Sequence, residues 1–101
     1  MTACTEWVVY RLKQGTTDGY EKSHEAVIEA LRDMEGFLEF ESMKGIKDSL
    51  LRLDKVVWKD ARCALAGFEA FQSLAVAKPF MDQVASIEFS GHFLPAKQIH
   101  D

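Results

Sequence analysis

His24 is the side chain of this sequence best placed to move a proton. It follows Tyr20 by four residues and precedes Val27 by three, so it shares the apolar stripe of a predicted helix and faces the interior. A histidine titrates near neutral pH, so it can take a proton from a phenol or a quinol. The alternative is a structural histidine, hydrogen-bonded to a backbone carbonyl or to Tyr10. His24 is therefore the candidate catalytic base, with the structural role left open.

Two other groups of polar side chains share a strand face. Arg52 and Asp54 lie two residues apart, and Glu88, Ser90 and His92 alternate along the chain, so each group points to one side of its strand. We expect Arg52 and Asp54 to form an ion pair between two subunits, or Arg52 to hold an anionic ligand. The other three residues are interpreted as a semi-polar surface that meets a partner sheet.

The remaining reactive side chains predict neither a metal site nor a cofactor. The three histidines, at positions 24, 92 and 100, fall on different predicted elements, whereas a metal needs three or four convergent ligands. Cys4 and Cys63 are the only cysteines and form no C-x-x-C pair, so free thiols are expected. Residues 1–6 have no basic start and no signal-like core, which favours a cytoplasmic protein.

The elements that position these side chains follow from changes in periodicity. Strand-like and helical runs alternate in the order β-α-β-β-α-β, the split βαβ pattern. The runs cover residues 7–13, 20–34, 37–43, 50–59, 61–84 and 87–94. We predict one α+β domain over residues 1–101, with a ferredoxin-like fold whose four-stranded antiparallel sheet carries two helices on one face.

The ends and faces of the helices can also be predicted. Asp18 is expected to cap the first helix, with Thr16 or Thr17 as alternatives, and Asp60 to cap the second. Gly36 is expected to end the first helix, and Pro79 to break the second before a short helical turn over residues 80–84. The first helix has its stripe at Tyr20, His24, Val27, Leu31 and Met34, and the second at Leu65, Phe68, Phe71 (or Gln72) and Ala75.

Strict alternation assigns the strand faces. It places Leu38 with Phe40, and Ile87 with Phe89 and Phe93. The strand over residues 50–59 is ambiguous, because a bulge could switch its faces midway.

The first strand is apolar on both faces, with Val8, Tyr10 and Leu12 on one side and Trp7 and Val9 on the other. Two helices cover only one face of a sheet, so the other would expose a large apolar patch. We therefore predict a homodimer through the sheet face.

Charge excludes two classes of partner. Twelve basic and sixteen acidic residues give a net charge of −4, and no basic stripe is present. Nucleic acid and anionic membrane surfaces both require a clustered positive surface. No apolar stretch approaches the roughly 20 residues that span a bilayer.

Two short motifs, Gly36-Phe-Leu-Glu-Phe-Glu41 and Val56-Val-Trp-Lys-Asp60, resemble those of the dimeric α+β barrel superfamily, in particular the antibiotic-biosynthesis-monooxygenase-like group. There a Gly-Phe opens strand two and a Trp closes strand three. The resemblance spans roughly residues 5–94. It implies a homodimer whose two sheets form a barrel with the helices outside, and a pocket between the helices and the sheet of each subunit.

The resemblance also implies a chemistry, the cofactor-independent oxygenation of aromatic polyketides and quinols. One branch of the group degrades haem with an Asn on strand one, the strand-three Trp and a His on helix two. Trp58 matches the Trp, but the sequence contains no Asn, and Phe68 or Phe71 occupies the His position. Haem breakdown is therefore not expected here.

Two hypotheses remain, and the content of the pocket separates them. The pocket is expected to be lined by Tyr10, Phe40, Trp58, Phe68 and Phe71, although Trp58 could simply pack in the core. Convergent polar groups beside Trp58 would support an oxygenase acting on a small aromatic or quinol. A cavity filled by Phe40, Phe68, Phe71 and Phe89 would support a non-catalytic homodimeric module with a hydrophobic ligand or a stress-related role.

Overall fold

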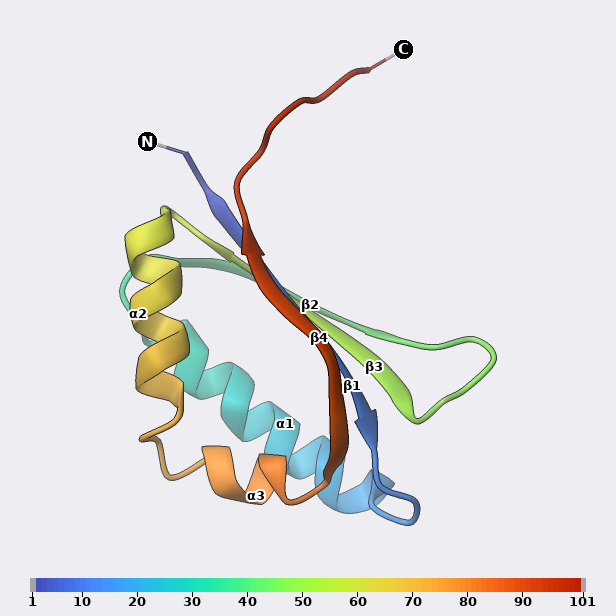
Figure 1. Cartoon of the computed structure of the whole chain (residues 1–101). Coiled ribbons are helices and arrows are strands. Elements are labelled where there is room, and N and C mark those ends of the chain that lie inside the picture. Colours follow the sequence, from blue (N-terminus) through green and yellow to red (C-terminus); the bar gives the residue numbers. More distant parts are fainter. Residues whose placement is uncertain (1, 101) are drawn as a thin grey trace.

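The computed structural model describes residues 2–100 and confirms the predicted order of elements (Figure 1). One short additional helix, α3, precedes the last strand. The elements are β1 (Cys4–Leu12), α1 (Thr17–Arg32), β2 (Phe37–Lys44), β3 (Leu51–Trp58), α2 (Ala61–Phe71), α3 (Ala77–Met81) and β4 (Val84–Phe93).

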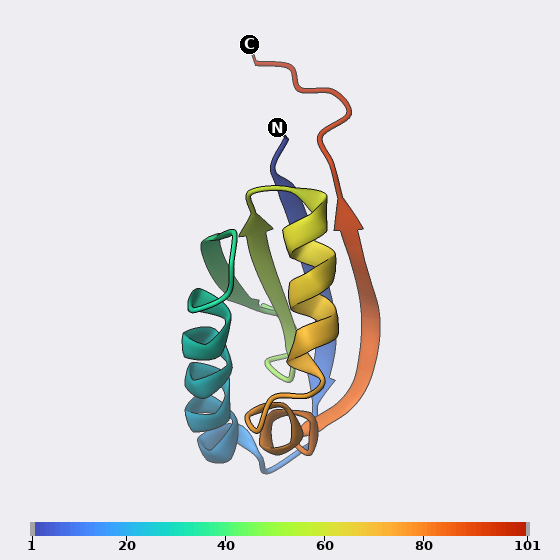
Figure 2. The ribbon, with the colours of Figure 1, turned by 90° about the vertical axis from the view of Figure 1, so that its left-hand side faces the viewer.

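The four strands form one antiparallel sheet in the order β2-β3-β1-β4. All three helices lie on the same face of this sheet (Figures 1 and 2). The fold is therefore the predicted α+β, ferredoxin-like arrangement. The core lies between the helices and the sheet, and its largest fully buried side chains are Trp58, Tyr10 and Tyr20.

The inward stripe of α1 is as predicted, because Tyr20, His24, Val27 and Leu31 are buried. The stripe predicted for α2 is wrong at Leu65, whereas Phe71 packs against the core as predicted. The buried residues of α2 are small, namely Cys63, Ala64 and Gly67, whereas Leu65 is 56% exposed. A Cβ atom on Gly67 would lie 2.6 Å from the Trp58 ring. The thin face of α2 is thus turned to the sheet because the large indole needs the space.

The helix ends differ from the predictions at three points. Helix α1 begins at Thr17 with Thr16 at the N-cap, so Asp18 is not the cap. The same helix ends at Arg32, and Gly36 instead takes a left-handed φ of 83° before β2.

The break in the second helical run lies between α2 and α3, and Pro79 sits in the first turn of α3, where a missing N–H is tolerated. At α2 the prediction is confirmed, because Asp60 accepts a hydrogen bond from the Cys63 N–H.

Two bulges overturn the strand faces predicted from alternation. The pairing of β2 with β3 shifts between Phe37 and Glu39. Phe37 and Phe40 therefore both pack against the core, and Leu38 is 57% exposed.

The pairing of β1 with β4 shifts between Val9 and Tyr10. Ser90 and His92 consequently lie opposite Val8 and Glu6, on the helix-covered face. Phe89 and Phe93 lie on the open face, where they stack on each other. The interpretation of Ser90 and His92 as part of a partner-facing surface is therefore wrong.

The inward and outward faces of β3 do not switch along the strand, so the bulge considered from the sequence does not occur where the assignment was ambiguous. Asp54, Val56 and Trp58 alternate as buried residues facing the helices. The opposite sheet face has no cover within residues 2–100. Its apolar side chains include Trp7, Val9, Met43, Leu53, Phe89 and Phe93.

Candidate functional site

A cavity of about 390 Å³ lies between the helices and the sheet, within the range of small-molecule sites. Most of its wall is apolar. The polar side chains in the wall are Glu6, Tyr10, Asp54, Gln72 and Ser90. Phe68, Met81 and Ile87 also line it and are each 40–44% exposed. The cavity therefore opens to solvent between α2, α3 and β4.

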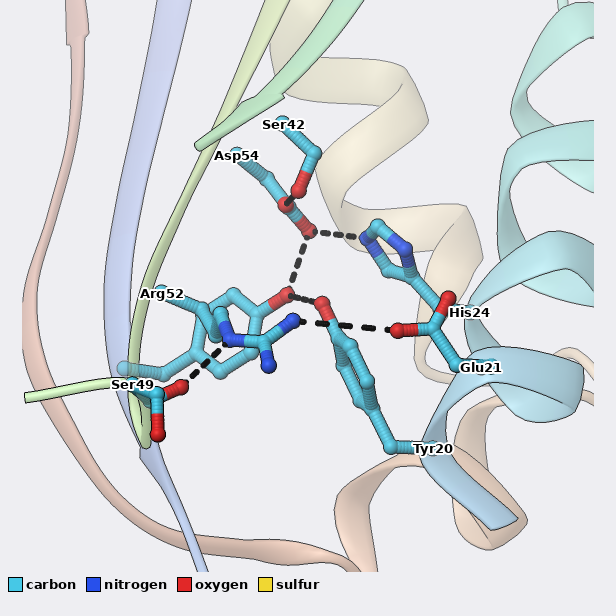
Figure 3. A network of polar contacts seen from close by, with 8 residues as sticks. Tyr20, Glu21, His24, Ser42, Ser49, Arg52 and Asp54 are labelled. Atoms are coloured by element: carbon cyan, nitrogen blue, oxygen red, sulfur yellow. Dashed lines mark hydrogen bonds and ion pairs between the residues drawn. The ribbon is translucent and has the colours of Figure 1, made fainter. Parts of the chain in front are cut away.

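Asp54 is the centre of a buried hydrogen-bond network (Figure 3). Its Oδ2 atom accepts a hydrogen bond from the Tyr10 hydroxyl at 2.9 Å and lies 2.9 Å from His24 Nε2. Its Oδ1 atom accepts a hydrogen bond from the Ser42 hydroxyl, also at 2.9 Å. Strands β1, β2 and β3 and helix α1 each contribute one side chain. A carboxylate has about four acceptor positions, so one remains for a ligand hydroxyl.

The two buried tyrosines extend this network. Their hydroxyl oxygens are 2.7 Å apart. Because the Tyr10 hydroxyl donates to Asp54, the Tyr20 hydroxyl must donate to Tyr10. Burial raises the pKa of both phenols, and the nearby Asp54 carboxylate raises them further. Both side chains are therefore neutral donors at physiological pH, and the one in the cavity wall is Tyr10.

His24 is buried, as its place on the helical stripe predicts, but its partner is Asp54 rather than a carbonyl or Tyr10. Its ring is stacked on Tyr20, with centroids 4.8 Å apart, and lies 6.0 Å from the ring of Phe80. His24 is not among the residues that line the cavity, whereas Asp54 is. His24 therefore contacts Asp54, and Asp54 is the residue that can contact a ligand in the cavity. The role of His24 as a base remains a prediction.

Arg52 does not pair with Asp54 in the part of the chain that the structure describes. Its guanidinium lies 5.0 Å from the centroid of the Tyr20 ring, and its Nε donates to the Ser49 carbonyl at 2.8 Å. Glu21 Oε1 is 3.9 Å from the guanidinium. The predicted ion pair between subunits is wrong, because this face of β3 is covered by the helices of its own chain.

A second polar group surrounds Glu6, which the sequence analysis missed. Trp58 Nε1 donates to Glu6 Oε1 at 3.1 Å, and His92 Nε2 lies 3.7 Å from the same oxygen. Glu6 is buried, and this burial raises the pKa of its carboxyl group. Alternation along the first predicted strand places Glu6 on the same face as Val8 and Tyr10. Nothing in the sequence indicates that Trp58 and His92 meet it there.

The side chains predicted to form the pocket are found in two layers. Tyr10, Phe40, Phe68 and Phe71 line the cavity. Trp58 is fully buried behind the wall, where it packs against Gly67. It does not line the cavity itself, but it is hydrogen-bonded to Glu6, which does. Phe89 lies on the other face of the sheet.

Among residues 2–100, no three His, Cys, Asp or Glu side chains are grouped so as to hold a metal ion. No described helix is both long enough and apolar enough to cross a membrane.

The sequence matches no protein-family model and no curated protein. The fold, by contrast, matches several solved structures. One is a protein from Bordetella bronchiseptica, provisionally named an antibiotic biosynthesis monooxygenase, with a TM-score of 0.79 and 13% identity over 96% of this chain and 100% of that one. A similarly named protein from Chloroflexus aurantiacus has a TM-score of 0.70 and 14% identity, over 98% of each chain.

A third match is SnoaB, a cofactor-independent oxygenase from Streptomyces nogalater. It has a TM-score of 0.77 and 13% identity, over 99% of this chain and 97% of SnoaB. At such low identity these likenesses show a shared fold.

Proposed function

We propose that this protein is a cofactor-independent monooxygenase that acts on a small aromatic or quinol substrate in the cavity between the helices and the sheet. The observation that carries the proposal is the position of Asp54. Its carboxylate lies in the wall of an otherwise largely apolar cavity and is hydrogen-bonded to a buried histidine. The fold shared with SnoaB supports the same reaction class.

The proposed reaction begins when Asp54 accepts the proton of a substrate hydroxyl, while His24 shares the proton through Nε2. The electron-rich anion passes one electron to O₂, and the resulting radicals combine to form a C–O bond at a ring carbon that bears hydrogen. The peroxide regains the proton. Loss of the ring C–H proton and cleavage of the O–O bond then release water and leave a carbonyl. A phenol and O₂ thus give a quinone and water, with the substrate as the only reductant.

The surroundings of Asp54 suit this role. The Tyr10 and Ser42 hydroxyls donate to its carboxylate and His24 contacts it, so it needs little rearrangement when the substrate binds. The apolar wall, including Val8, Phe40 and Phe71, excludes water from the anion and the radical pair.

We further propose that the open sheet face forms a homodimer, as the sequence predicts. Apolar side chains lie along this face, and Phe89 and Phe93 are each almost half exposed. Lys55 lies there between Glu39 and Glu41, at 3.4 and 3.9 Å, so the apolar residues have a charged border. Uncovered apolar patches of this kind mark protein–protein interaction sites.

Oxygen uptake with a panel of phenols and quinols tests the proposed reaction. The wild-type protein should consume O₂ with at least one member of the panel, and Asp54→Asn should lower turnover by about 10²–10⁴-fold. Glu25→Gln, an exposed change beside His24 in sequence, should leave turnover unchanged. Tight binding without any oxygen uptake would instead favour the alternative, a non-catalytic ligand-binding module.

A further inference from the structure

Glu6 has one carboxyl oxygen without a hydrogen bond among the residues that the structure describes. Its Oε1 atom accepts from Trp58 and faces His92, whereas Oε2 has no hydrogen bond to any residue between positions 2 and 100. Glu6 lines the cavity although the residue is only 8% exposed. Nε2 of His92 is also buried and lacks a hydrogen-bond partner among the same residues. Buried polar atoms without partners are costly, so this group is suited to a polar atom of a ligand.

The position of Glu6 relative to Asp54 sets the spacing of two anchors. Glu6 pairs with Val56, and Val8 pairs with Asp54, on neighbouring strands. The two acidic residues are therefore diagonal neighbours on one sheet face, at a separation of about 7–8 Å. Val8 and Val56 form the other diagonal and also line the cavity. A flat apolar surface thus lies between two carboxyl groups.

We propose that Glu6, together with His92, is a second ligand anchor, and that the ligand is a flat aromatic molecule with a hydroxyl group at each end. One hydroxyl donates to Asp54 and the other to Glu6 Oε2, while the ring lies on the two valines. The aromatic class of the ligand rests on the proposed function. The requirement for a second hydroxyl rests on Glu6 alone.

A site built in this way discriminates against ligands with one hydroxyl, because such a ligand displaces water from Glu6 Oε2 without replacing its hydrogen bond. The matched probes are 2,6-dihydroxynaphthalene and 2-naphthol, which differ by a single hydroxyl group. Binding is measured by calorimetry without oxygen, so that no turnover takes place. The wild-type protein should bind the dihydroxy probe about 10- to 100-fold more tightly than the monohydroxy probe.

The variant Glu6→Gln keeps the side-chain shape and an acceptor for Trp58, but it presents an NH₂ group in place of the free oxygen. Its NH₂ group can donate only a neutral hydrogen bond to the second hydroxyl oxygen, so the preference should fall to a few-fold, with 2-naphthol bound as tightly as by the wild type. Glu6→Asp, which withdraws the carboxyl group by one methylene, should also lose the preference and serves if the glutamine variant melts early. Glu25→Gln is the control and should keep the preference.

An unchanged preference in a folded Glu6 variant would overturn the inference, as would equal binding of both probes by the wild type. The failure of the proposed reaction has a different signature. If the Glu6-dependent preference is found but no substrate of the panel consumes O₂, the anchor stands and the oxygenase proposal falls.

Discussion

At the scale of single residues, the central point is that the base predicted from sequence and the group that faces the ligand are different residues. His24 is buried on α1, while its partner Asp54 lies in the cavity wall. The helical stripe predicts that His24 faces inward. It gives no information on which strand residue it meets, because that depends on which face of β3 is covered. The spacing of Arg52 and Asp54 predicts that they share a face, but the partner of each is set by α1.

Two variants of His24 separate a proton carrier from a residue that only orients Asp54. His24→Ala should lower turnover by about 10²–10⁴-fold. His24→Gln can still donate to Asp54 but cannot take up a proton, so on the present account it should lose as much.

Thermal unfolding provides the control for these variants. Removing one partner of a buried hydrogen bond costs about 1–3 kcal/mol, so both proteins should remain folded at assay temperature. Full activity in His24→Gln would mean that the histidine positions Asp54 and carries no proton. Full activity in a folded His24→Ala would remove His24 from the mechanism.

At the scale of elements, the position of α2 depends on the absence of a side chain at Gly67. Its Cβ atom would meet the Trp58 ring at 2.6 Å, and Trp58 in turn holds Glu6. Gly67→Ala gains about 1 kcal/mol of helix propensity but overpacks the core at a cost of about 1–3 kcal/mol. We therefore expect a net destabilisation in chemical denaturation, together with weaker ligand binding.

Gly19 is the matched control because it also lies in a helix. A Cβ atom there would meet only the end of the flexible Gln83 side chain. Gly19→Ala should raise the free energy of unfolding by up to about 1 kcal/mol. If Gly67→Ala proved as stabilising as Gly19→Ala, the close approach of α2 to Trp58 would not be what requires a glycine.

The order of the elements could be predicted because each run has a clear period of two or of about 3.6 residues. The bulges could not, since a single extra residue in a pairing leaves no compositional signal. Those bulges decide that Phe37 joins Phe40 in the core and that Phe89 leaves it. They also bring His92 to Glu6. The second polar group of the site was therefore hidden from the sequence, whereas the aromatic part of the cavity wall could be foreseen.

At the scale of the whole molecule, the bare sheet face is expected to be buried between two copies of the chain. Sedimentation equilibrium at micromolar concentration should give twice the mass of the chain. Phe89→Glu places a charge among the apolar side chains of that face and should shift the protein towards monomer. Leu65→Glu is the control, since Leu65 is similarly exposed on the helical side and should leave the dimer intact. A wild-type monomer at this concentration would contradict the account.

The central claim is that the chain inserts one oxygen atom of O₂ into an aromatic substrate, with the substrate as the only reductant. The most direct test is turnover under ¹⁸O₂ with a chelator present, followed by mass spectrometry of the product. The account predicts one ¹⁸O atom in each product molecule, with the other in water, and no need for an added metal, cofactor or reductant. A product without ¹⁸O, or turnover that stops when metals are removed, would contradict it.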